Sequence, residues 1–417
     1  SSYFCSKRGT SKVSTAHLVR MEPGIHTPHM AIEAGADAQI LIEASRRLGL
    51  LQPQEDMVAC WLSPDGSLVT PQPSDSSSVP SVCQAIFAAV PHARVVISVR
   101  TPRVQEVARL PLAHAVELET VGGTSLRCLS QSSSAFYHSV AACENAADAQ
   151  AALENMPDAI ALQVRGDSCI YVFASDTGAA FVRAYTIDRV CRVQLLVGSR
   201  PVVMPDATTF LHARSQFGIP EFRQGVEWPA IVRWLSPEAS VAAEDTKAKR
   251  CTQLQQDADS DWSLKTDLSE AHQELHRLGL DELIWNHCSA KSGQGDAYYV
   301  TPGDRMWANI LPGDLLANST NVTANILHDA VYMSTVAKAV VHLHSPAIEA
   351  ISCLEEGLLA PAGCAFKNRV AYHDWEGFSD DQDECRRVAE AIRNVPECLA
   401  LILRNHGAIT FGGTIAE

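Results

Sequence analysis

The sequence lacks a long apolar run and an excess of basic residues. No apolar stretch approaches the roughly 20 residues that a membrane-spanning helix needs, so no transmembrane segment is expected. The 33 basic residues are outnumbered by 48 acidic ones, which gives a net charge of -15. That balance argues against non-specific binding to nucleic acid or to anionic lipid. Residues 1–29 have no apolar signal core, and we expect an N-terminal tail there.

The sequence also lacks a paired-cysteine pattern. It contains 13 cysteines, an odd number, and their spacing does not follow the zinc-ribbon or zinc-knuckle patterns. In a chain of 417 residues such cysteines are most simply reduced thiols, which is typical of a cytoplasmic protein. Apolar residues make up 46% of the chain, enough to fill the cores of two or three domains.

Four segments recur in the same order in the two halves of the chain, and recurrence in register predicts a duplicated domain. Each copy alternates helical patterns with short apolar strands, which predicts an α/β domain. The recurring pairs are 41–50 with 268–280, 69–71 with 300–302, 93–102 with 337–346, and 157–165 with 396–404.

The repeats set the expected domain boundaries. We expect the first copy at residues 30–235 and the second at residues 263–417. Residues 236–262 between them are polar and charged, as in an exposed linker. After its last strand the first copy continues into residues 177–199, which we expect to form an amphipathic helix. The second copy reaches Glu417 where that helix would begin, so we expect it to be truncated before its last helix.

Three histidines of the second copy are candidate metal ligands. His342 and His344 flank Leu343 in the run AVVHLHSP, and residues two apart in a strand point to the same face. His406 follows another apolar run, LILRNHG. Three histidines with one open position are typical of a catalytic zinc, which polarises a carbonyl group. The alternative is three unrelated histidines, some of them buried and hydrogen-bonded.

Together with LIWNHCSAK and the turn VAYHD at residues 370–374, these motifs resemble the class II aldolase/adducin family. The resemblance covers about residues 268–417 and is closest to the adducin head domain. It implies an αβα three-layer sandwich with a mostly antiparallel central sheet, here in two tandem copies. It also implies Zn²⁺ bound by His342, His344 and His406 in the second copy only, and a homo-oligomer of the tetramer type.

The resemblance implies a substrate site as well. Ser289, Thr301 and Gly303 fall near the loops that hold the substrate phosphate in the aldolases, and hydroxyl and backbone donors suit an anion. Ordinary turn chemistry is the alternative explanation for these three residues.

The acid/base glutamate of the aldolases is replaced in this sequence. It precedes by four residues the histidine that corresponds to His328, and Ala324 stands at that position. Proton transfer needs an ionisable group within reach, and by family position Tyr372 and His373 are the nearest candidates, with Asp374 beside them.

The first copy has lost the histidines. Its counterparts of His342, His344 and His406 are Ser98, Arg100 and Asp167, and an arginine places a positive charge where the metal would lie. We therefore expect a degenerate copy that keeps the fold without the metal.

Two functions follow from the resemblance. The one we favour is an adducin-like, non-catalytic scaffold that oligomerises and associates with actin or other cytoskeletal proteins, because Ala324 replaces the glutamate. An acidic chain with no basic tail argues against it. The alternative is a zinc-dependent aldolase, epimerase or dehydratase that acts on a small phosphorylated sugar, because the histidine trio is complete.

Overall fold

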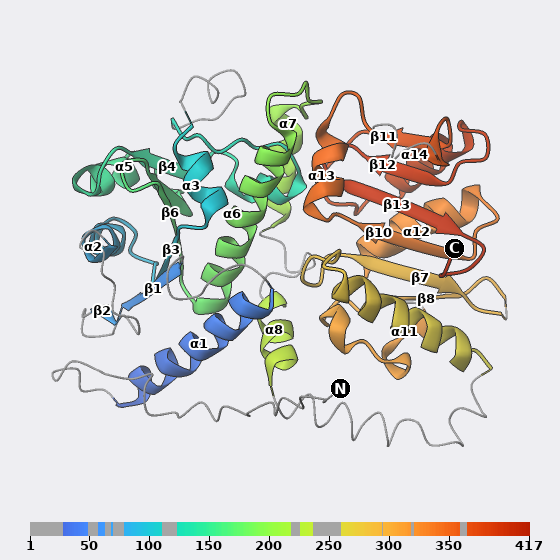
Figure 1. Ribbon diagram of the computed structural model, residues 1–417, viewed down its shortest axis with the longest axis horizontal. Helices are drawn as coiled ribbons and strands as arrows, with labels where there is room; N and C mark the ends of the chain where they lie inside the picture. Colours follow the sequence, from blue (N-terminus) through green and yellow to red (C-terminus); the bar gives the residue numbers. More distant parts are fainter. Residues whose placement is uncertain are drawn as a thin grey trace, which may run out of the picture.

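The chain forms two α/β halves that lie side by side in the computed structural model (Figure 1). Of the expected tail and linker, residues 1–27 and 237–259 lie outside the described residues. No described helix combines the length and the apolar content needed to cross a membrane. The structure describes residues 28–48, 57–62, 68–69, 79–110, 123–217, 226–236, 260–293, 295–317, 321–358 and 365–417.

The first half contains a long central helix, α6, and a six-stranded sheet. Its described helices are α1 (Pro28–Arg47), α2 (Val79–Ala89), α3 (Pro102–Ala108), the short η1 (Gln131–Phe136), η2 (Ala146–Asp148), α5 (Ala149–Glu154), α6 (Thr177–Val197), α7 (Ala207–Gln216) and α8 (Glu227–Leu235). Its strands are β1 (Met57–Leu62), β2 (Leu68–Val69), β3 (Val95–Val99), β4 (Val140–Cys143), β5 (Ala161–Val164) and β6 (Cys169–Ala174).

The second half begins with a helix and contains a seven-stranded sheet. Its described helices are α11 (Trp262–Arg277), η4 (Trp307–Asn309), η5 (Pro312–Asp314), α12 (Val322–Ser334), α13 (Pro346–Cys353) and α14 (Gln382–Arg393). Its strands are β7 (His287–Lys291), β8 (Tyr298–Val300), β9 (Leu316–Ala317), β10 (Ala339–Leu343), β11 (Val370–His373), β12 (Ala400–Leu403) and β13 (Gly407–Gly412).

Both sheets are mostly antiparallel, as expected, and each also contains one parallel pair, so both are mixed. The orders are β2-β1-β3-β6-β5-β4 and β11-β12-β13-β10-β7-β8-β9. The pairs β4–β5 and β11–β12 are parallel, whereas the other described pairs are antiparallel. Parallel neighbours need a long crossover, and α5 and α14 lie in those crossovers.

The two sheets have matching topologies. When β1 to β6 are paired in turn with β7, β8, β10, β11, β12 and β13, both the neighbours and the strand directions coincide. The second sheet has one additional strand, β9, at its edge.

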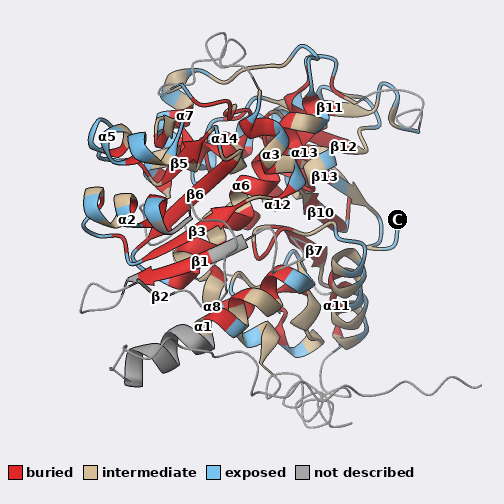
Figure 2. Ribbon diagram, turned by 60° about the vertical axis from the view of Figure 1, so that its left-hand side comes forward, coloured by how far each residue is buried: buried red, intermediate tan, exposed pale blue. Residues whose placement is uncertain are grey.

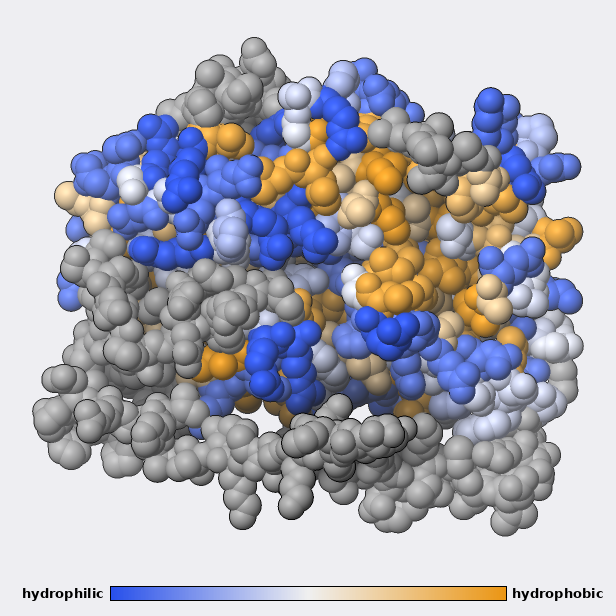
Figure 3. All heavy atoms as spheres, viewed as in Figure 1, coloured by the Kyte–Doolittle hydropathy of each residue, from blue (hydrophilic) through white to orange (hydrophobic). Residues whose placement is uncertain are grey.

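Helices cover both faces of each sheet, with buried strands between them (Figure 2). In the first half, α2 and α5 pack on one face, while α3 and α6 pack on the other. In the second half, α12 and α14 pack on the face that contains Val340, while α11 packs on the face that contains Val341. In the view of Figure 3, hydrophilic residues cover α11 and hydrophobic residues gather above it, toward the middle of this half.

Helix α6 is buried from several sides and lies between the two halves (Figure 1). It packs on β3 and β6 of the first sheet and also on α13 of the second half. Its buried residues include the polar Asp188, Arg189 and Gln194. The helix expected at residues 177–199 is present as α6, but it is not amphipathic, because the second half covers the face that would otherwise meet water.

Candidate metal site

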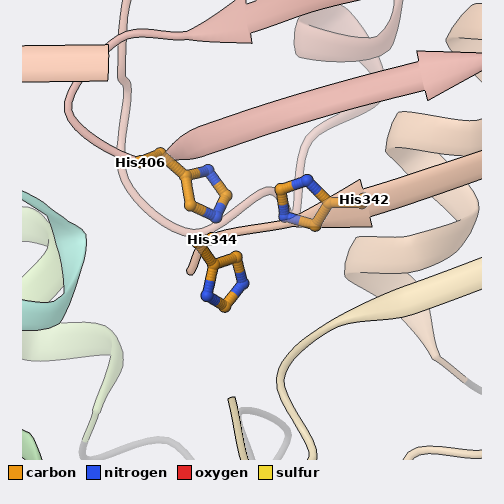
Figure 4. Close-up of side chains that lie close together, drawn as sticks. All are labelled: His342, His344 and His406. Atoms are coloured by element: carbon orange, nitrogen blue, oxygen red, sulfur yellow. The ribbon is translucent and has the colours of Figure 1, made fainter. Parts of the chain in front are cut away.

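The three predicted histidines meet at one point. One ring nitrogen from each of His342, His344 and His406 lies within 4.8 Å of the other two, and all three residues are buried. Their ring centroids are 4.9 to 5.2 Å apart, and Figure 4 shows the rings turned toward one another. No other group of three or more His, Cys, Asp or Glu side chains with this geometry occurs among the described residues.

Adjacent strands bring the three histidines together. His342 lies in β10, opposite Ile409 of the antiparallel β13, and His344 follows the end of β10. His406 lies just before β13, so the antiparallel pairing returns it to the end of β10. Gly407 is needed at this crossing, because a Cβ there would lie 2.6 Å from the Leu343 carbonyl oxygen.

A tight turn fixes the backbone of His406. Asn405 has a φ of 57°, a left-handed conformation that asparagine adopts more readily than most residues. Its amide Nδ2 donates to the carbonyl oxygens of Leu129 at 2.8 Å and Val203 at 2.7 Å, both in the first half. The turn that carries His406 is therefore anchored on the other half of the molecule.

The Nδ1 atoms of His342 and His344 are each hydrogen-bonded to an oxygen atom. His342 Nδ1 lies 3.1 Å from the Ala408 carbonyl oxygen, and His344 Nδ1 is hydrogen-bonded to Glu282. A histidine that donates through Nδ1 presents a lone pair on Nε2. Burial also lowers the pKa values of His342 and His406 well below the usual range, so both rings are neutral at pH 7, the form that binds metals.

Glu282 is part of a buried ion-pair network that spans the two halves. Arg189 of α6 lies 2.9 Å from Glu282 and 2.8 Å from Glu349 of α13, and Glu349 also accepts a hydrogen bond from Ser130. Burial opposes ionisation of Glu282, but Arg189 and His344 lower the pKa of this carboxyl below its ordinary value. The carboxylate that orients His344 is therefore itself held by the first half.

The first half also contacts His406 directly. Gln131 Nε2 lies 3.1 Å from His406 Nε2, and Gln131 Oε1 accepts a hydrogen bond from the Trp375 indole at 3.1 Å. The hydrogen bond from the Trp375 indole fixes the orientation of the Gln131 amide, so that its N–H points at His406. A metal on His406 Nε2 would take the lone pair that this N–H now contacts, so the amide would have to turn away.

Two further histidines lie behind the trio. The ring centroids of His287 and His342 are 4.6 Å apart, and His287 Nδ1 lies 2.7 Å from His328 Nε2. His328 is hydrogen-bonded in turn to Ser289, whose hydroxyl lies 2.7 Å from the Tyr332 hydroxyl. Ser289 is fully buried in β7 within this chain of hydrogen bonds.

The other predicted phosphate-binding residues lie elsewhere. Thr301 is fully buried, and its hydroxyl lies 2.7 Å from His272 Nε2 and accepts from the Cys288 amide at 2.6 Å. Gly303 lies in a half-buried turn. The substrate role of these two residues and of Ser289 stays a prediction.

Tyr372 and His373 lie on the edge strand β11. The Tyr372 hydroxyl accepts from the Leu358 amide at 3.2 Å, and Arg404 stacks over its ring. His373 Nε2 lies 3.3 Å from a Glu376 carboxylate oxygen, and burial lowers the pKa of His373. Both side chains thus have partners away from the trio, and their proposed part in proton transfer stays a prediction.

Beside His373 lies a buried acid, Glu384 of α14, whose pKa burial raises to about 7. The folded protein therefore holds a proton that the unfolded chain releases near pH 4.5, so this group makes stability fall as pH rises from about 4.5 to 7. We expect Glu384→Gln to raise the free energy of unfolding at pH 8 by up to roughly 3 kcal/mol. Chemical denaturation at pH 5 and pH 8 measures the effect.

The matched control is Glu390→Gln, because Glu390 is an exposed residue of the same helix. An equal gain from both substitutions, or a Glu384→Gln gain that is the same at pH 5 and pH 8, would show that the Glu384 carboxyl is not the source of the pH dependence.

Ala324 lies in the first turn of α12, one helical turn before His328 on the same buried face. Its methyl group is fully buried, and its amide donates to the Asn321 side chain that caps the helix. The position of the aldolase glutamate therefore holds a side chain that cannot transfer a proton.

The first half holds an ion pair near the equivalent position. Arg100, at the end of β3, lies 3.9 Å from Asp167, and it also donates to the Tyr171 hydroxyl at 3.4 Å. The turn between β5 and β6 spans residues 165–168, and the turn between β12 and β13 spans residues 404–406. The turn of the first half is therefore one residue longer. Counted on from the end of β5, the counterpart of His406 is Asp167, whereas counted back from β6 it is Ser168.

A cavity of about 750 Å³ opens beside the trio, between the two halves. His344 and Glu282 line one end of it, and α6, α8 and η1 of the first half supply much of the remaining wall. This volume is in the range of small-molecule sites. Sequence reasoning missed Glu282, Arg189 and Gln131, since their roles arise from contacts between distant segments.

Comparison with known proteins assigns the second half. Residues 266–417 match the family model described as Class II Aldolase and Adducin N-terminal domain. Alpha-adducin of Rattus norvegicus is 31% identical over 157 residues, which cover 34% of this chain and 21% of the adducin. A putative aldolase class 2 protein of Caulobacter vibrioides is 28% identical over 176 residues, which cover 38% of this chain and 67% of that protein.

A solved structure of an aldolase II superfamily protein from Pseudomonas syringae is 24% identical, with a TM-score of 0.36. The match covers 38% of this chain and 71% of that one. The family-model match confirms the resemblance inferred from the motifs of the second half. The chain spans only 21% of the length of the rat alpha-adducin that it matches.

Proposed function

We propose, on the premise that residues 266–417 form a class II aldolase and adducin family domain, that His342, His344 and His406 hold a divalent metal, Zn²⁺. The proposal rests on one observation: three buried imidazoles present nitrogens within 4.8 Å of one another. The donor set fits the ion, because zinc is commonly bound by neutral imidazoles whose other ring nitrogen is hydrogen-bonded to an oxygen atom, as in His342 and His344. A zinc ion held there supplies a Lewis acid that polarises a carbonyl oxygen.

The chain's own residues prepare this site. Glu282 holds the ring of His344, and Arg189 holds Glu282, so the orientation of the ring does not depend on solvent. The backbone oxygen of Ala408 does the same for His342. The cavity beside His344 admits a small molecule, and its carbonyl group would lie at the histidine end. We therefore favour a small-molecule site over a purely structural role for the second half.

We infer further that the first half is a degenerate copy of the same domain. The matching strand order and directions of the two sheets support this inference, as do the four recurring segments. Arg100 stands where His344 stands in the second half, which would exclude a cation there. The first half contributes Arg189, which holds Glu282 beside His344, and Gln131, whose amide would turn away from His406 if a metal were bound.

Cobalt(II) tests the proposed centre, because its visible absorption reports coordination number. We expect the full chain to bind Co²⁺ with the intense bands of a four- or five-coordinate ion. Acetohydroxamate, a small chelator, should shift those bands, because three protein ligands leave a position open. Weak octahedral bands that acetohydroxamate does not change would rule out the open three-histidine centre.

A second candidate function is an adducin-like scaffold without catalysis. The observation in its favour is Ala324, which leaves the site without the acid/base group of the aldolases. In this case the chain would oligomerise and associate with the cytoskeleton. Co-sedimentation with filamentous actin and light scattering after size-exclusion chromatography test it, and a monomer that stays in the supernatant would contradict it.

A further inference from the structure

The cavity between the halves has two cationic residues in its wall. Arg183 projects from α6, and Arg214 from α7. Among the described residues, both form hydrogen bonds only from Nη1 to backbone carbonyls: Arg183 donates to Phe173, and Arg214 donates to Tyr137 at 3.0 Å and to His138 at 3.4 Å. A guanidinium has five N–H donors, so most of its donors remain for a ligand.

Neither guanidinium forms an ion pair with a carboxylate of the described residues. Both residues are half-buried, and burial lowers the pKa of Arg183. The charge of Asp176 acts on Arg183, but the two side chains do not form an ion pair. A half-buried cation without an ion-pair partner is costly, which favours an anion from outside.

The acids of the cavity wall are already engaged. Asp176 caps α6, where it accepts from the Ala179 amide at 2.8 Å, and Glu282 is paired with Arg189 and His344. Glu227 is buried at the start of α8 and has a partner of its own. The two arginines are therefore the cations of this wall that have hydrogen bonds only to backbone carbonyls.

The rest of the wall is largely aromatic and aliphatic. Trp228 of α8 packs directly on Gly178, where a Cβ would lie 2.5 Å from the indole. Sugar hydroxyls against such a surface would lose their hydrogen bonds to water. An aromatic or aliphatic body suits this wall better. The aromatic residues of the wall are Phe136, Phe217, Trp228, Trp285 and Phe378.

We propose that this cavity binds a small organic anion with an apolar, preferably aromatic, body, held by Arg183 and Arg214, with its carbonyl group toward His344. The ligand class differs from the phosphorylated sugar expected from the sequence. The proposal deepens the metal-site function and rests on it for the placement of the carbonyl group. The anion site itself needs only the two arginines and the apolar wall.

Titration calorimetry on the full chain, with zinc and after EDTA treatment, tests the proposal with three probes. Phenylpyruvate carries a carboxylate and a ring, phenyl phosphate a phosphate and a ring, and dihydroxyacetone phosphate a phosphate without a ring. We expect at least one aromatic probe to bind about 10-fold or more tightly than dihydroxyacetone phosphate, and the tighter of the two identifies the anion. Tighter binding of dihydroxyacetone phosphate, or no binding of either aromatic probe, would overturn the proposal.

Variants locate the anion group. Arg183→Met and Arg214→Met should each lower the affinity for the aromatic probe about 10-fold or more, because each substitution removes a charge-assisted hydrogen bond. Arg192→Met is the matched control, since Arg192 is an exposed residue of α6 outside the cavity wall. Arg183→Lys keeps the charge and should retain more binding than Arg183→Met. Equal affinity in the control and in the Arg183 and Arg214 variants would also overturn the proposal.

The two metal states separate this proposal from the metal site. Arginine-dependent binding in a chain that takes up no zinc would keep the anion site and remove the metal proposal. Zinc uptake without binding of any aromatic probe would keep the metal proposal and remove the anion site.

Discussion

Replacing Arg189 with methionine is expected to lower the free energy of unfolding by about 3 to 5 kcal/mol. The guanidinium is buried between Glu282 at 2.9 Å and Glu349 at 2.8 Å, and both carboxylates are themselves buried. Without it, two carboxylates from the second half would lie against an apolar side chain with no counter-charge. Denaturant unfolding followed by circular dichroism measures the loss.

The control for this prediction is Arg192→Met on the same helix, which should change stability by less than about 0.5 kcal/mol, because Arg192 is exposed. A triple variant, Arg189→Met with Glu282→Gln and Glu349→Gln, should recover much of the loss, because no uncompensated charge remains. If Arg189→Met were as stable as the control, the network would not hold the halves together.

The second large effect concerns the histidines. The double variant His342→Ala/His344→Ala should lose zinc affinity by about 100-fold or more, because losing a single outer-shell partner already costs roughly 10 to 100-fold. Competition with a fluorescent zinc chelator measures the affinity. The folded state is checked by circular dichroism in EDTA, and His406→Ala gives a second, single-residue variant of the same site.

His212→Ala is the matched control, since His212 is exposed on α7 and has no part in the trio. Zinc affinity unchanged in the double variant but lowered in the control would place the metal outside the trio. A loss in both would indicate unfolding, which the circular dichroism spectra would reveal.

Arg189 also links stability to the site. It holds Glu282, and Glu282 holds His344, so the first half acts on the candidate metal site through one ion pair and one hydrogen bond. Arg189→Met should therefore weaken zinc binding as well. The first half, which we proposed to be a degenerate copy, would in this way complete the candidate site of the second.

The histidine trio was predictable because each member has a local signal. His342 and His344 are two residues apart in a β-branched run, and His406 ends another run. The strand alternation and the order of the motifs were sufficient to group them. A parallel pair could also have been predicted from the sequence. A helical pattern at residues 382–393 separates β11 from β12, and parallel neighbours are usually joined by such a helical crossover.

The remainder of the site has no local signal. Arg189 and Glu282 are 93 residues apart by number, and no periodicity relates them. Buried charges in a helix are unusual, so Asp188 and Arg189 in the middle of α6 were the one hint available. Their partners, and the burial of α6 itself, depend on how the two halves pack, and that is decided by tertiary contacts alone.

The zinc content of the full chain tests the central claim most directly. After equilibrium dialysis against buffered zinc, elemental analysis should find about one zinc per wild-type chain and almost none in His342→Ala/His344→Ala. A wild-type chain without zinc, or a double variant that retains it, would contradict the claim that His342, His344 and His406 form a metal centre.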